Sequence, residues 1–259
     1  MDKEIVIVVP SESAAYDVVK ALKALDEEGS IELYSSTVIV KSKEGTVSVK
    51  DARHLDGGLG TLLGLSTGAL VGLLGGPVGL AIGAAVGGAT GLGADLAYSG
   101  FAGDFVNGVA TRLQPGSHAV VASVWEDWTV PVDVAVASHG AVVFRQATDD
   151  IVMAQIRAEM QALKEEQVHV EAEIAKATGD AKTTLEAKRV ELRAKQAAQR
   201  ERLQKRAKKL EESWEAKIAS VKKKAAEAKA GAKTRHEEHM QKLSRFAALQ
   251  KESFRELFA

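Results

Sequence analysis

The sequence predicts an α+β domain that is interrupted by an apolar, glycine-rich insert and followed by a long helical arm. Three observations predict this organisation. β-Branched runs alternate with helical patterns in the first 150 residues, 38 consecutive residues from Gly57 to Ala94 carry no charge, and Ala, Glu, Lys, Arg, Gln and Leu dominate from about residue 148 onward. We therefore divide the chain into residues 1–56 with 101–147, residues 57–100, and residues 148–259.

The domain begins with a short strand and a capped helix. Ile5 to Val9 is a β-branched run closed by Pro10, which is typical of a buried strand. Ser11 or Ser13 is placed to cap a helix that ends near Gly29.

The remaining elements of the domain, in chain order, are predicted as strands over 31–41 and 46–50, a helix over 101–113, a strand over 118–125, a helix over about 131–138 and a strand over 141–145. The order strand, helix, two strands, helix, strand is that of a ferredoxin-like α+β sandwich, which the last helix and strand complete. The insert falls between the third strand and the second helix.

Glycine recurs at every fourth position of the insert in two runs. These are Gly60, Gly64, Gly68, Gly72 and Gly76, and then Gly79, Gly83, Gly87 and Gly91. Each glycine in a helix costs about 1 kcal/mol against alanine, whereas a small-residue face lets helices approach closely in lipid. We expect a glycine-zipper helical hairpin that enters a membrane and forms an oligomer interface. The alternative is a close-packed helical pair buried in a soluble core.

Length limits how this hairpin can cross a bilayer. The first arm, over about residues 60–74, reaches only ~22 Å, against a hydrocarbon core of ~30 Å. A re-entrant hairpin, local bilayer thinning or packing in an oligomer is therefore favoured over two full spans.

The third part of the chain predicts a basic coiled-coil arm. Its heptad seam is formed by Ile156, Met160, Leu163, Val170 and Ile174, and then by Leu203, Leu210, Trp214 and Val221. Residues 177–180 (Ala-Thr-Gly-Asp) are expected to break the first helix. An aromatic patch with Phe246, Phe254 and Phe258 follows near residue 259, and the second seam is expected to continue to Ala232.

Charge is divided unevenly between the two halves. Residues 1–150 contain 9 Lys+Arg against 18 Asp+Glu, and residues 151–259 contain 25 against 17. This asymmetry is compatible with head-to-tail packing of copies, or with binding of the basic arm to anionic lipid or an acidic protein surface. Nucleic acid is disfavoured because the basic stretch lacks interleaved aromatic residues. The chain has no cysteine, which excludes disulfides and thiol chemistry.

No motif predicts catalysis, a cofactor or a metal. Residues 64–68 (Gly-Leu-Ser-Thr-Gly) match a serine-hydrolase pattern, but the glycine repeat generates this match by itself. His236 and His239 lie three residues apart rather than four, so we expect a solvated helix face there instead of a zinc site.

Five motifs resemble the DUF1269 family of uncharacterised bacterial membrane proteins over roughly residues 1–146. They are Ile5–Val9, Val49–Asp51, Gly103–Phe105, Val130–Asp133 and Gly140–Val143, arranged around the glycine-rich segment. The resemblance implies a ferredoxin-like domain around a membrane hairpin, with no known activity. The arm after residue 147 departs from the compact pattern of the family.

We therefore predict a non-enzymatic, homo-oligomeric scaffold at the bacterial cytoplasmic membrane, with its soluble parts on the cytoplasmic side. Its expected partners are membrane lipid and further copies of the chain. One alternative is a pore formed by a ring of hairpins, lined near Ser66, Thr67, Thr90 and Asp95. Another is a soluble stress or interaction protein in which the hairpin is an assembly plug.

Overall fold

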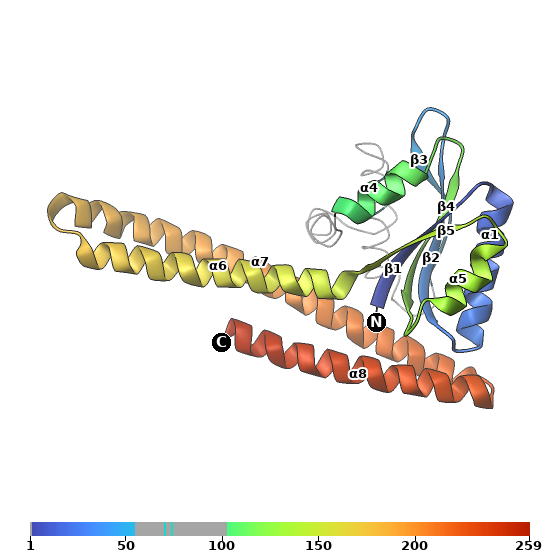
Figure 1. Cartoon of the computed structure of the whole chain (residues 1–259). Coiled ribbons are helices and arrows are strands. Elements are labelled where there is room, and N and C mark those ends of the chain that lie inside the picture. The colour runs from blue at the N-terminus through green and yellow to red at the C-terminus, as the bar shows by residue number, and fades with distance from the viewer. Residues whose placement is uncertain (1, 55–69, 71–73, 75–102) are drawn as a thin grey trace.

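The computed structural model describes residues 2–54, Leu70, Leu74 and residues 103–259 (Figure 1). It is a mixed α/β structure in which long helices extend away from a five-stranded antiparallel sheet. The elements are β1 (Asp2–Val9), α1 (Glu12–Glu27), β2 (Glu32–Lys41), β3 (Val47–His54), α4 (Gly103–Arg112), β4 (His118–Trp125), α5 (Val130–Ala137), β5 (Val142–Ala147), α6 (Thr148–Lys176), α7 (Gly179–Glu227) and α8 (Ala230–Phe258).

The sheet has the strand order β3-β2-β4-β1-β5, and all its neighbouring strands are antiparallel. Helix α1 connects β1 to β2 across β4, and helix α5 connects β4 to β5 across β1. The two β-α-β units therefore interlock, and both of their helices pack on one face of the sheet. The predicted α+β class is confirmed.

The predicted assignment of elements to this arrangement was partly wrong. We expected β3, α4 and β4 to supply the second half of the sandwich, with α5 and β5 added at the end. Instead, β4-α5-β5 is the second unit, β3 is an edge strand that pairs with β2, and α4 covers the opposite face. Order along the chain did not reveal which strands would be neighbours.

Both faces of the sheet are covered, which explains the continuous apolar run of β1. Ile5, Ile7 and Val9 face α1 and α5, whereas Val6 and Val8 face α4. All five side chains are buried. A strand covered on both sides reads as continuously hydrophobic because its two alternating rows both lie in cores.

Helix α1 begins and ends as its sequence predicts. Ser11 is the N-cap, and its side-chain oxygen accepts a hydrogen bond from the backbone N–H of Ala14 at 3.2 Å. The helix buries Val18, Val19 and Leu22 against the sheet. It is followed by Gly29, whose φ of 70° requires a left-handed backbone.

The predicted glycine-zipper hairpin lies almost entirely outside the described residues, and so do all nine of its repeat glycines. Leu70 and Leu74 are the exceptions. Both are buried, and they belong to the core between the sheet and α4. Among the described residues, no helix combines the length and apolar character that a membrane span requires.

The third part of the chain forms three helices that run back and forth (Figure 1). The first predicted break is confirmed, because α6 ends at Lys176 and α7 begins at Gly179. A second reversal was not predicted: the chain turns at Ala228 and Lys229, and α8 returns along α7. The second heptad seam was expected to continue to Ala232 in one helix, but α7 ends at Glu227 and Ala232 lies in α8.

We predict that two glycine-to-alanine substitutions will differ in cost. Gly29 and Gly45 both have positive φ, but only at Gly29 would a Cβ clash, lying 2.9 Å from the Cβ of Arg235 in α8. Gly45→Ala is expected to destabilise the protein by about 1 kcal/mol, because alanine is strained at a positive φ. Gly29→Ala is expected to cost about 1 kcal/mol more, because α8 must also shift to make room for the added Cβ. Urea unfolding measures both, and equal costs would contradict the close packing of α8 on the end of α1.

Candidate functional site

The densest group of polar side chains lies where the sheet meets the helical arm. We call this region the junction: the starts of β1 and β2 and the end of β4, in contact with α6, α7 and α8. Its apolar part consists of Tyr34 and Trp125 from the sheet, with Val221 from α7 and Leu243 from α8. Two clusters of charged side chains flank this apolar contact.

The histidine cluster is centred on Glu32, the first residue of β2, which is fully buried. The Nδ1 atoms of His236 and His239 in α8 lie 2.5 Å and 3.2 Å from the same carboxylate oxygen, Oε1. Lys224 of α7 donates to the other oxygen, Oε2, at 3.3 Å. One buried carboxylate thus binds two helices to the start of a strand.

The charge state of Glu32 follows from these contacts. Burial alone would raise the pKa of Glu32, but hydrogen bonds from His236 and His239 and the charge of Lys224 hold the pKa below its ordinary value. Glu32 is therefore a carboxylate that accepts hydrogen bonds, so each histidine presents an Nδ1–H to it.

Two more carboxylates enclose the histidine cluster. Asp26, at the end of α1, pairs with Lys224 at 2.5 Å, and burial raises the pKa of this aspartate despite the lysine. Asp127, just after β4, pairs with Lys242 at 2.6 Å and lies 3.6 Å from Nε2 of His239. These pairs join the end of α1 to α7 and the loop after β4 to α8.

The aspartate cluster lies at the start of β1. The Nζ atom of Lys217 in α7 donates to Oδ2 of Asp2 at 2.8 Å and to Oδ2 of Asp149 at 3.5 Å. Trp214, one turn earlier in α7, donates its indole N–H to the same oxygen of Asp149 at 2.7 Å. All four side chains are buried, so β1, α6 and α7 meet at one lysine.

Tyr34 lies between the two clusters. Its ring is 5.4 Å from Nζ of Lys217 and 5.9 Å from Nζ of Lys224, which is within cation–π range. Burial and the surrounding carboxylates raise the pKa of its hydroxyl well above the ordinary value. This hydroxyl has no hydrogen-bond partner within the described part of the chain.

The junction therefore has the chemistry of a structural contact. In the part of the chain that the structure describes, no group of three or more His, Asp or Glu side chains is arranged to hold a metal ion. The carboxylates, lysines and histidines are directed at one another. What the arrangement can do is fix the helices on the sheet and exchange protons.

The predicted solvated face at His236 and His239 was wrong. These side chains are 2% and 7% exposed, and they lie on the buried face of α8. A signal for this burial was present in the sequence, because His236, His239, Leu243 and Ala247 form one helical stripe. Nothing in the sequence predicted Glu32 as their partner, because that contact joins residues 204 positions apart.

The residues of the predicted seam pack within one chain. Ile156, Met160 and Ile174 of α6 are buried, and Leu163 is partly buried. Leu203, Leu210, Trp214 and Val221 of α7 are buried as well. The middle of α7 contacts both α6 and α8 in one apolar cluster. Whether seam residues also join copies of the chain stays a prediction.

The aromatic patch near residue 259 belongs to the same cluster. The ring of Phe254 stacks on Trp214 at 6.1 Å between centroids, and Phe246 meets the same indole edge-on at 5.6 Å. Phe258 lies against Phe254 at 6.3 Å. These rings hold α8 to α7 and leave Phe254 only 2% exposed.

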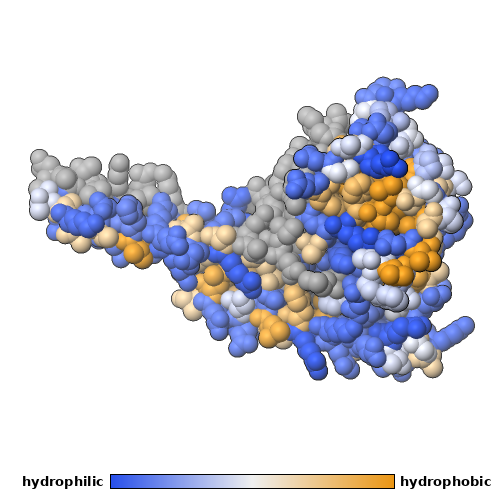
Figure 2. Space-filling model, viewed as in Figure 1, coloured by the Kyte–Doolittle hydropathy of each residue, from blue (hydrophilic) through white to orange (hydrophobic). Residues whose placement is uncertain are grey.

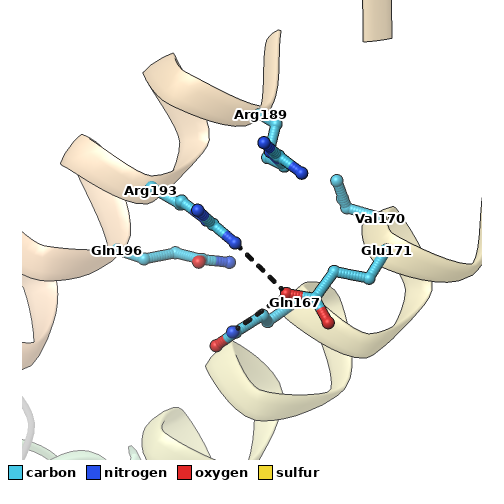
Figure 3. Close-up of a pocket in the computed structure, with 6 residues that line it drawn as sticks. All are labelled: Gln167, Val170, Glu171, Arg189, Arg193 and Gln196. Carbon is cyan, nitrogen blue, oxygen red and sulfur yellow. Dashed lines mark hydrogen bonds and ion pairs between the residues drawn. The ribbon is translucent and has the colours of Figure 1, made fainter. Parts of the chain in front are cut away.

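Part of the basic stretch of α7 is matched by acidic residues of α6. Helix α6 contains seven Asp+Glu and three Lys+Arg. Arg206 pairs with Glu159 at 2.9 Å, and Arg193 pairs with Glu171 at 3.5 Å. Figure 3 shows the second pair in a small hollow between the two helices, with Arg189 beside it.

Part of the chain matches a protein-family model. Residues 61–165 match the family model described as "Protein of unknown function (DUF1269)", so the predicted resemblance to this family is confirmed. The matched segment differs from the expected one: it begins after β3 and extends into α6. No curated protein and no solved structure matches the chain.

We predict that Glu32→Gln will destabilise the protein by about 3 kcal/mol at pH 7, because it removes the buried carboxylate that His236, His239 and Lys224 all contact. The pKa of Glu32 is lowered, so its contribution is present above about pH 4.5 and is lost as the pH falls. The difference from the wild type should therefore shrink at pH 3.5.

Urea unfolding at both pH values measures this difference. Glu238→Gln is the matched control, because Glu238 is exposed in α8 between the two histidines and should leave the unfolding midpoint unchanged. A difference for Glu32→Gln that is the same at pH 7 and pH 3.5 would contradict the assigned role of the carboxylate.

Proposed function

We propose that this chain, whose residues 61–165 match the DUF1269 family model, is a non-enzymatic scaffold that assembles with further copies of itself at a membrane. In this proposal the α+β domain is a rigid base, the helical arm is the element presented to partners, and the glycine-rich segment is the anchor and assembly element. The bacterial cytoplasmic membrane, with the described parts on its cytoplasmic side, is the proposed location.

The observation that carries the proposal is the way the junction fixes α7. This helix has 49 residues and is therefore about 73 Å long, given a rise of ~1.5 Å per residue. One part of it is held on the sheet by Lys217, Val221 and Lys224, and its first part extends with α6 away from the sheet (Figure 1). A long helix held at one end by buried contacts presents the other end in a defined direction.

The described polar side chains of the junction are arranged for contact between elements. The polar groups of the junction are buried and directed at one another, and the hollow between α6 and α7 is small and lined by Gln and Arg side chains as well as Val170 and Glu171. A catalytic site needs polar groups converging on an accessible cavity. The described residues support binding and assembly better than catalysis.

The membrane component of the proposal rests on the sequence pattern of residues 57–100. Fifteen glycines occur between residues 57 and 100, with two phases of four-residue spacing. This spacing is the small-residue pattern by which helices associate in lipid. Homo-oligomerisation through the same glycines links anchoring with assembly.

A second candidate is a soluble interaction protein in which the glycine-rich segment packs on the domain or between copies. The burial of Leu70 and Leu74 favours it, because both side chains occupy the core between the sheet and α4. At this point the segment contacts protein rather than lipid. The two candidates differ in whether the full chain requires a membrane or detergent.

Electrostatic recruitment of a partner is the weakest component of the proposal. Arg193 and Arg206, two of the basic residues in α7, already face carboxylates of α6. Anionic lipid or an acidic protein surface would therefore contact only the outward-facing lysines and arginines of the arm.

We predict that Gly83→Leu will reduce the size of the assembled particle, because a leucine on the glycine phase blocks close approach of helices. Ala81→Leu is the matched control, since it adds a leucine two residues away and off both glycine phases. Light scattering in mild detergent measures particle mass. Equal masses for both variants and the wild type would count against a glycine-mediated interface.

We also predict that the full chain will sediment with membranes and resist extraction by alkaline carbonate. Apolar insertion withstands carbonate, whereas peripheral electrostatic binding does not. Fractionation of cells that express the full chain is the measurement. If the full chain remains in the supernatant and is soluble without detergent, the membrane component is wrong and the soluble interaction protein is supported.

A further inference from the structure

We propose that the contact of α6 and α7 with the start of β1 is controlled by a proton that Asp2 and Asp149 share beside Lys217, and that this contact loosens when the proton is lost. The inference rests on the proposed function for its biological meaning, because it regulates the arm that the scaffold presents. Its physical basis is the geometry of the aspartate cluster.

The cluster places two carboxylates on one ammonium group in a closed environment. Oδ2 of Asp2 is 2.8 Å from Nζ of Lys217, and Oδ2 of Asp149 is 3.5 Å from the same atom. The side chains of Asp2 and Lys217 are each 4% exposed, and that of Asp149 is 10% exposed. Water cannot screen an excess charge at this position as it would at the surface.

Among the described residues, the groups around Asp2 do not balance a second carboxylate. Strand β1 contributes Glu4, α6 contributes Asp149, and α7 contributes Lys217, which is paired with both aspartates. Strand β2, which lies beyond β4 in the sheet, contributes Tyr34, whose raised pKa keeps its hydroxyl uncharged at neutral pH. The more distant Lys224 is paired with Asp26 and Glu32.

Two ionised aspartates would therefore leave a net negative charge in the contact. A buried pair of carboxylates relieves such an excess by retaining one proton between them. Burial raises the pKa of Asp149, but the charge of Lys217, the contact with Asp2 and the indole N–H of Trp214 hold it below the ordinary value. The pair therefore shares one proton, which Asp149 gives up more readily than Asp2.

The pH at which this proton is lost lies near neutrality. Burial, with a further contribution from Asp149, raises the pKa of Asp2 from 3.8 to about 7, although Lys217 acts in the opposite direction. A carboxyl whose pKa is raised on folding stabilises the contact fully below its unfolded pKa and loses that contribution as pH rises to its folded pKa. The contact should weaken between about pH 4 and pH 7 and then stay constant.

The expected size of the effect follows from one bound proton. Each proton taken up on closure changes the closing equilibrium by up to about tenfold per pH unit. Between pH 5 and pH 7, the open population of the contact should rise by as much as about a hundredfold. From pH 7.5 to pH 9 it should not change further, because the pKa of Lys217 is raised and the lysine stays charged.

Amide hydrogen exchange of the full chain, read by mass spectrometry, tests the inference. The readout is the protection of residues 213–221 of α7, corrected for the intrinsic pH dependence of exchange. In the wild type this protection should fall from pH 5 to pH 7 and reach a plateau above pH 7.5. Protection that is constant over the whole range would overturn the proposal.

Two variants locate the proton. Asp2→Asn and Asp149→Asn each leave one carboxylate for Lys217, so each should abolish the pH dependence between pH 5 and pH 7. Asp17→Asn in α1 is the control, because Asp17 lies in an exposed pair with Lys20, and it should retain the wild-type slope. A wild-type slope in both junction variants would also overturn the proposal.

This experiment is independent of assembly. Exchange within α7 reports a contact inside one chain, whereas the scaffold proposal is tested by particle mass and membrane association. A chain that remains monomeric but shows the proton-dependent protection would refute the scaffold and retain the switch. A chain that assembles but whose α7 protection does not change with pH would retain the scaffold and refute the switch.

Discussion

The burial of charge at the start of the sheet is the constraint on which the rest of the structure depends. Asp2 and Glu32 begin two parallel strands and are 7% and 0% exposed. An uncompensated buried carboxylate costs several kcal/mol, so both must meet cations or donors wherever the chain places them. Helix α7 supplies Lys217 to Asp2 and Lys224 to Glu32, two helical turns apart. The spacing of these lysines thus matches the spacing of the strand starts, and this match orients α7 across the sheet.

The same constraint explains why α8 folds back. Lys224 contacts Oε2 of Glu32, whereas the side chains that contact Oε1 come from α8. His236 and His239 make these contacts only if the chain reverses at Ala228 and Lys229. Once reversed, α8 also delivers Phe246 and Phe254 to Trp214, which extends the contact along α7. The contacts of the two histidines with Glu32 fix the first part of α8, and the packing of its phenylalanines on Trp214 fixes the last part. Together they define one position for α8 along α7.

The features of the fold that the sequence predicts are those set by neighbouring residues, and those that depend on contacts between distant residues are missed. Ser11, the run from Ile5 to Val9, and residues 177–180 are local signals, and they correctly indicate a cap, a buried strand and a helix break. Strand neighbours and the reversal before α8 depend on contacts between distant residues, so local patterns misassigned β3 and missed the turn. The junction shows the same limit. A polar residue at the start of a strand, such as Glu32, looks solvent-exposed until the arm that covers it is known.

The contacts of the junction change the interpretation of the unequal charge of the two halves. We interpreted the acidic first half and basic second half as a means of binding other molecules. Within the described residues, the basic half contacts the acidic half of its own chain, through Lys217 with Asp2, Lys224 with Glu32 and Lys242 with Asp127. Part of the asymmetry is therefore used to hold the arm on the domain.

One part of the surface that these contacts do not explain is apolar. Trp128, Val130 and Val134 are 60%, 49% and 69% exposed, and Figure 2 shows hydrophobic surface over α5. Exposed apolar surface of this kind is typical of interaction sites, so its chemistry differs from that of the paired charges that hold the arm on the domain.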